Sequence, residues 1–127
     1  MKTDNVIVEK TFSFAIRIVN LYKHLNKNKK EFVLSNQILR SGTSVGANVN
    51  EAICGISKKD FLAKMYIAYK EIIETIYWIE LLYKTEYLTE KEYTSILSEA
   101  SEISKILSSI TKQQEWGIPN SSFLIPN

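Results

Sequence analysis

Residues 40–52 read RSGTSVGANVNEA, and small residues crowd this stretch. It is either a glycine-rich loop that binds phosphate or one continuous helix, and the choice decides the fold class. A Walker-type loop needs a closing GK[ST] and a preceding strand, and the sequence offers neither. Apolar or small residues instead recur at spacings of three and four across both glycines, at Leu34, Ile38, Gly42, Val45, Val49, Ala52 and Ile53. This period predicts a helix.

A polar stripe follows the opposite side of the same predicted helix, again at spacings of three and four. Each internal glycine costs the helix roughly 1 kcal/mol relative to alanine, and a close approach of neighbouring backbones would offset that cost. Tight packing inside one protomer would explain the glycines alone. The order of the polar line favours, in addition, a seam with another helix of the bundle or with a second subunit. The stripe consists of Gln37, Arg40, Ser44, Asn48 and Glu51.

The remaining chain also predicts helices. Its 127 residues include only two prolines, at positions 119 and 126, so no proline interrupts the preceding segments. Ser57 to Asp60 resembles a capping box, and Thr89 to Glu92 is a full one. We therefore predict an all-α fold, an up-down-up-down four-helix bundle in residues 1–115 with an irregular tail in 116–127. The helices are expected at about 5–26, 31–54, 58–85 and 90–113.

The first predicted helix is apolar over more than half of its circumference, whereas a surface helix needs an apolar stripe of only about 100°. We expect a second subunit to cover the surplus. In the tail, Trp116 and the apolar residues 123–125 either dock on a neighbour or remain free, and we favour docking.

Charge is distributed unevenly, although the net charge is only +2. Residues 4–30 hold six bases and two acids, whereas the chain from residue 86 onward holds three bases and six acids. The basic side chains of the first helix and the following turn are candidates for contacts with the phosphates of RNA or DNA. A solvated lysine face is the alternative. The candidates are Lys10, Arg17, Lys23, Lys27, Lys29 and Lys30.

No catalytic or metal-binding pattern emerges. A di-metal bundle needs two Glu-x-x-His pairs, but the only histidine, His24, has Leu21 three positions before it. Cys54 is the only cysteine, so no internal disulfide is possible, which suits a reducing cytosol. It has no nearby histidine and is expected to be a small buried residue. No apolar stretch approaches 18 residues. We therefore expect no enzyme, no cofactor and no membrane segment, and a cytoplasmic location.

Three segments together resemble a known family: RSGTSVGANVNEA at 40–52, SKKDF at 57–61 and IAYKEIIETIYWIELL at 67–82. They are similar to the four-helix-bundle proteins encoded in 23S rRNA intervening sequences, a family that includes the accessory variability protein of diversity-generating retroelements. The resemblance runs over roughly residues 5–112, and its most specific part is S-V-x-x-N-V-x-E-A at 44–52.

The resemblance implies a ring-shaped homopentamer, which would explain the wide apolar arc of the first helix. For the retroelement members it implies binding to nucleic acid and to a reverse transcriptase. Arg40, Asn48 and Glu51 match polar positions of the family, which implies a bundle seam or a subunit contact. We therefore expect a non-enzymatic oligomeric scaffold that associates with RNA or DNA. The alternative is a scaffold or accessory subunit that binds only proteins, such as a reverse transcriptase.

Overall fold

The computed structural model describes residues 2–113, and the side chains of residues 6–112. This part of the chain forms four helices and no strand, which confirms the predicted all-α fold. The predicted tail, with Trp116 and residues 123–125, lies outside the described residues. The helices are α1 (Lys2–Lys27), α2 (Val33–Ile53), α3 (Lys58–Lys84) and α4 (Glu90–Gln113).

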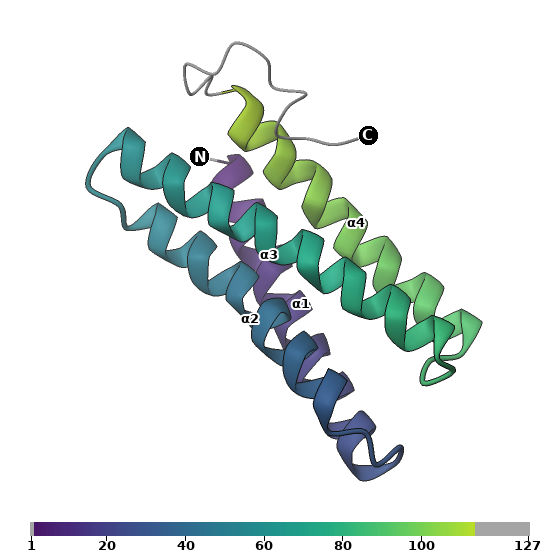
Figure 1. The fold of residues 1–127 in the computed structure, drawn as a ribbon. Helices are drawn as coiled ribbons and strands as arrows, with labels where there is room; N and C mark the ends of the chain where they lie inside the picture. Colours follow the sequence, from purple (N-terminus) through teal and green to yellow (C-terminus); the bar gives the residue numbers. More distant parts are fainter. Residues whose placement is uncertain (1, 114–127) are drawn as a thin grey trace.

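Successive helices run in opposite directions, so the α1–α2 and α3–α4 connections lie at one end of the molecule (Figure 1). The α2–α3 connection and the start of α1 lie at the other end. α1 packs closely on α2, α2 on α3 and α3 on α4, whereas α1 and α4 touch much less. The first and last helices therefore form the loosest seam of the bundle.

The opening stretch is helical throughout, because residues 40–52 all lie within α2. Its glycines Gly42 and Gly46 face α1. A Cβ atom at Gly42 would lie 2.8 Å from Cγ1 of Ile18, and one at Gly46 would lie 3.3 Å from the backbone oxygen of Thr11. On the α3 side, the buried hydroxyl of Thr75 donates a hydrogen bond to Ser41 Oγ over 2.9 Å. The small residues therefore serve close helix packing.

α2 begins at Val33, two residues later than expected; Phe32 is its N-cap residue, and the side chain of the preceding Glu31 caps the helix start. The Glu31 carboxylate is buried and accepts the backbone N–H groups of Val33, Leu34 and Ser35 over 3.2, 2.9 and 2.7 Å. These N–H groups have no partner inside the helix, so the carboxylate supplies the acceptor that the helix itself lacks.

The other two helix starts follow the predicted capping boxes. At α4 the box is reciprocal: Thr89 N–H donates to the Glu92 carboxylate over 2.8 Å, and Glu92 N–H donates to Thr89 Oγ1 over 3.1 Å. At α3, Asp60 N–H donates to Ser57 Oγ over 3.1 Å. The expected burial of Cys54 is wrong. This residue follows the last residue of α2, in the connection at the end of the bundle, and its side chain is exposed.

α1 carries apolar residues on two sides. Phe14 and Ile18 are fully buried in the core, whereas Phe12 and Ile16, each two positions earlier, are 62% and 51% exposed. Two positions along a helix correspond to nearly opposite directions. The core of one protomer therefore covers only one part of the wide apolar arc.

Candidate functional site

The basic stripe of α1 faces the acidic stripe of α4. Lys10 Nζ lies 3.0 Å from a carboxylate oxygen of Glu102. Arg17 donates to Glu99 over 2.7 Å and to the Ser95 hydroxyl over 2.8 Å. Two of the six predicted phosphate-binding residues are thus paired inside the protomer. The uneven charge of the sequence is partly neutralised by the fold.

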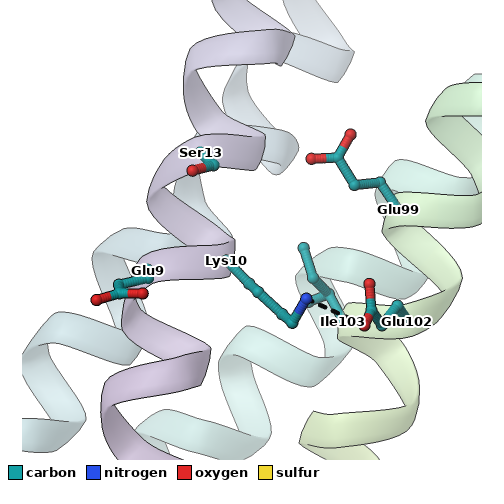
Figure 2. A pocket seen from close by; sticks show the side chains of 6 residues that line it. All are labelled: Glu9, Lys10, Ser13, Glu99, Glu102 and Ile103. Carbon is teal, nitrogen blue, oxygen red and sulfur yellow. Dashed lines mark ion pairs between the residues drawn. The ribbon is translucent and has the colours of Figure 1, made fainter.

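A hollow of about 260 Å³ separates α1 and α4 beside Lys10 (Figure 2). In this view the Lys10 ammonium reaches Glu102 across the gap, while the side chain of Glu99 extends from α4 toward α1. Glu9 and Ser13 border the hollow on α1, and Ile103 forms part of its wall on α4. The Lys10 ammonium is already paired with Glu102, and Glu99 is paired with Arg17, so the hollow offers phosphate no unpaired cation.

The other four predicted residues lie at the end of the bundle formed by the α1–α2 connection. We call Lys23, Lys27, Lys29 and Lys30 the lysine end. All four are exposed, and none forms an ion pair with a residue in the described part of the chain. The structure therefore divides the six predicted residues into a paired set on the α4 side and an unpaired set at one end.

Lys30 has a backbone conformation that lysine rarely adopts, with φ of 56°. It follows the end of α1, where the N–H of Glu31 donates back to the Leu25 carbonyl over 2.9 Å. Glycine normally occupies this left-handed position after a helix, since other residues suffer a clash between Cβ and the backbone. The chain instead places an ammonium group at the tip of the turn.

Residues that were not candidates from the sequence lie beside the lysine end. The α3–α4 connection lies at the same end, and Lys29 borders a hollow there together with Tyr83, Lys84 and Tyr87. The up-down order of the helices was the available signal, because it places the end of the third helix beside the end of the first.

The polar stripe of α2 lies against α3 of the same protomer. The Arg40 guanidinium donates to Glu71 over 3.3 Å and also to Glu74, which in addition accepts the Trp78 indole N–H over 3.0 Å. The hydrogen bond from Arg40 is the main reason that the pKa of Glu74 falls below its ordinary value. The same hydrogen bond is the main reason that the pKa of Arg40 is raised.

The rest of this stripe is also accounted for within one chain. Glu51 pairs with Lys64 of α3 over 2.8 Å. Ser44 Oγ donates to the Arg40 carbonyl over 2.7 Å, and the Asn48 amide donates to the Ser44 carbonyl over 2.9 Å. Gln37 is exposed. The geometry thus places the charged members in the α2–α3 seam of the bundle, one of the two sites that the sequence left open.

No cluster of three or more His, Cys, Asp or Glu side chains suited to a metal ion occurs among the described residues. Within the same part of the chain, no helix has the length and hydropathy needed to cross a membrane.

Comparison with known proteins is consistent with this geometry. A crystal structure from Bacteroides thetaiotaomicron, of a protein with unknown function from the S23 ribosomal protein family, shares 55% sequence identity with this chain. The match has a TM-score of 0.85 and covers 87% of this chain and 98% of the other. No curated protein matches the chain. The family model of the 23S rRNA-intervening sequence proteins matches residues 3–109. This range covers the four helices except the first residue of α1 and the last four of α4. The chain therefore belongs to this family.

Proposed function

We propose that this protein is a non-enzymatic, homo-oligomeric scaffold that binds RNA or DNA through its lysine end. The observation that carries the proposal is the set of four exposed lysines that form no ion pair with a described carboxylate. Such side chains attract phosphate and release the counterions condensed on nucleic acid. The link of the family to 23S rRNA intervening sequences supports the same conclusion.

The strained backbone at Lys30 supports this assignment independently. A residue other than glycine in the left-handed region costs of order 1 kcal/mol and persists where it serves a purpose. At Lys30 the position projects a charge from the turn, which glycine would not do. Glu86 has the same kind of conformation after α3, with φ of 72°, and provides a matched site of opposite charge.

The first test is a fluorescence-anisotropy titration of the full chain with a structured RNA and with a DNA duplex over a range of salt concentrations. We expect log K to fall linearly with log salt, by about 0.7–0.9 per phosphate neutralised. Absence of binding at low salt would overturn the proposal. Proteins such as a reverse transcriptase would then be the partners to test.

A pair of charge reversals locates the interface. Lys29→Glu with Lys30→Glu should weaken binding by at least tenfold and lower the salt slope. Lys58→Glu with Lys59→Glu makes the same change in net charge at the opposite end of the bundle, where both side chains are exposed, and should have a much smaller effect. Equal losses in the two variants would show that only net charge matters.

Replacement of Lys30 by glycine separates binding from stability. Lys30→Gly should raise the free energy of unfolding by about 0.5–1 kcal/mol because it relieves the left-handed strain, yet it should weaken nucleic-acid binding. Glu86→Gly should give a similar gain in stability without weaker binding. Unchanged binding by the Lys30 variant would remove this residue from the interface.

The oligomeric part of the proposal rests on the outer side of α1. Phe12 and Ile16 project from the bundle, and the neighbouring Val8 and Val19 are only partly buried. A second copy that covers this strip would bury it, and a ring-shaped homopentamer is the assembly that the family resemblance implies. Because Arg40 and Glu51 are paired within the protomer, the apolar strip is the better candidate for the contact.

Light scattering coupled to size-exclusion chromatography tests the contact. Ile16→Glu should dissociate the oligomer. Ile56→Glu alters an isoleucine that is 93% exposed in the α2–α3 connection and should leave the assembly intact. An intact oligomer in the Ile16 variant would overturn the proposed interface.

A further inference from the structure

We propose that the hollow at the α3–α4 connection holds an unpaired nucleobase, so that the lysine end recognises single-stranded rather than duplex nucleic acid. This inference rests on the proposed nucleic-acid binding and specifies its substrate class. The hollow has a volume of about 360 Å³, within the range of pockets that hold small ligands, and is lined mainly by Lys29, Tyr83, Lys84, Glu86 and Tyr87.

The aromatic rings supply a surface for a base. Tyr83 stacks on Tyr93 of α4, with ring centroids 4.0 Å apart and planes inclined by 6°. Tyr93 thus covers one face of the Tyr83 ring. The Lys84 ammonium also lies over this ring, 6.0 Å from its centroid. The partly buried Tyr87 also borders the hollow.

A base can replace the ammonium over Tyr83, since an exposed cation–π contact is weak and the lysine side chain is flexible. The base would then continue the stack formed by Tyr83 and Tyr93. The displaced ammonium of Lys84 remains within reach of the adjoining phosphate. Aromatic stacking beside a cationic surface is the usual arrangement in proteins that bind single strands.

The charges around the hollow suit a phosphate on each side of the base. Lys29 comes from the α1–α2 connection and Lys84 from the end of α3, so two ammonium groups from different segments border the same space. Glu86 is the one carboxylate in the lining, which leaves a net positive charge. A base inside a duplex has both faces covered by its neighbours, so a strand with exposed bases is the ligand that fits.

The experiment compares three labelled probes on the full-length protein: a single-stranded RNA, the duplex of the same sequence, and inorganic polyphosphate. The wild type should bind the single strand on the order of tenfold more tightly than the duplex, as expected for one stacked base. Equal affinity for the two would overturn the inference while leaving the proposed function intact. No binding to any probe would overturn the proposed function itself.

Variants then test the ring. Tyr83→Leu should lose about tenfold in affinity for the single strand and almost nothing for polyphosphate, whereas Tyr83→Phe should retain wild-type affinity for both. Tyr77→Leu, at an exposed tyrosine elsewhere on α3, is the control and should change neither. An unchanged affinity of a folded Tyr83→Leu protein for the single strand would contradict the inference.

If the Tyr83 variants do not fold, Lys84→Gln tests the same hollow, because Lys84 is exposed and its replacement should not disturb the core. This variant should weaken binding of both the single strand and polyphosphate by several-fold. If Lys84→Gln leaves single-strand binding unchanged, the hollow does not hold the strand.

Discussion

α1 contacts its two neighbours in opposite ways. Against α2 it packs on glycine, and a Cβ atom at Gly42 would lie 2.8 Å from Ile18. Against α4 it is held by long charged side chains, Lys10 with Glu102 and Arg17 with Glu99. Hollows of about 260 and 240 Å³ lie along this second seam.

The difference shows how side-chain size sets the spacing of helices. Glycine lets two backbones approach until apolar side chains from one helix fill the surface of the other, and dispersion contacts then dominate. Lysine, arginine and glutamate hold the helices farther apart and leave space between them. Since partly exposed ion pairs contribute only about 0–1 kcal/mol each, we expect the α1–α2 seam to carry most of the stability and the α1–α4 seam to open first.

The same truncation in the two seams gives the sharpest comparison. Ile18→Ala removes a fully buried side chain at the glycine contact and should lower the free energy of unfolding by about 4 kcal/mol. Ile103→Ala, equally buried but at the wall of the α1–α4 hollow, should cost about 2 kcal/mol, since water can enter the enlarged space. Urea unfolding at one fixed protein concentration measures both. Equal losses would show that the two seams are equally well packed.

Adding volume at the glycine contact should also be harmful. Gly42→Val should cost about 3 kcal/mol, because the new side chain overlaps Ile18 in a fully packed region. Ala47→Val on the exposed side of the same helix should change the free energy of unfolding by less than about 0.5 kcal/mol. Combining Gly42→Val with Ile18→Ala should cost less than the sum of the single changes, since one makes room for the other. Simple additivity would rule out the proposed steric contact.

The sequence predicted the features of this fold that depend on local pattern. The helical interpretation of residues 40–52 followed from a period that continues through Gly42 and Gly46, and the Thr89 capping box depends on residues only three apart. Prediction of the ion pairs between α1 and α4 would have required the register of these two helices. The spacing of the charges does not give this register, because the paired bases Lys10 and Arg17 are seven residues apart whereas their partners Glu102 and Glu99 are only three apart.

Two features of the candidate site could not be predicted in this way. The left-handed turn at Lys30 lacks the glycine that normally marks one, so its sequence carries no conformational signal. The hollow beside Tyr83 depends on the meeting of two connections that are more than 50 residues apart in the chain. Tertiary packing, not local sequence preference, creates both the left-handed backbone at Lys30 and the aromatic surface beside Tyr83.

The ion pairs of the loose seam should contribute modestly and depend on salt. Arg17→Met keeps the apolar part of the side chain but loses the contacts with Glu99 and Ser95, which should cost about 0.5–1 kcal/mol at low ionic strength. In about 1 M salt the loss should shrink to a few tenths, because the pair is partly exposed and screened. Lys23→Met alters an exposed lysine that has no described ion-pair partner and should have no such salt dependence. A loss that persists at high salt would point to packing rather than charge.

The smallest expected effect concerns Glu92, an acidic residue near the turn end of the α1–α4 seam. A hydrogen bond from the Thr89 backbone lowers the pKa of this carboxyl below its ordinary value of 4.5, with lesser contributions from His24 and Lys29. A carboxyl whose pKa falls on folding stabilises the protein above its unfolded pKa, and this contribution is lost as the pH falls through the folded pKa. Glu92→Gln should therefore cost a few tenths of a kcal/mol at about pH 7 and progressively less toward about pH 3.

Urea unfolding at both pH values measures this difference. The control is Glu80→Gln, which removes a carboxylate from an exposed position in the interior of α3, away from any helix start, and should give no comparable loss at either pH. If the loss in the Glu92 variant is the same at both pH values, the ionised carboxylate does not stabilise the start of α4, and the α1–α4 seam owes nothing to this charge.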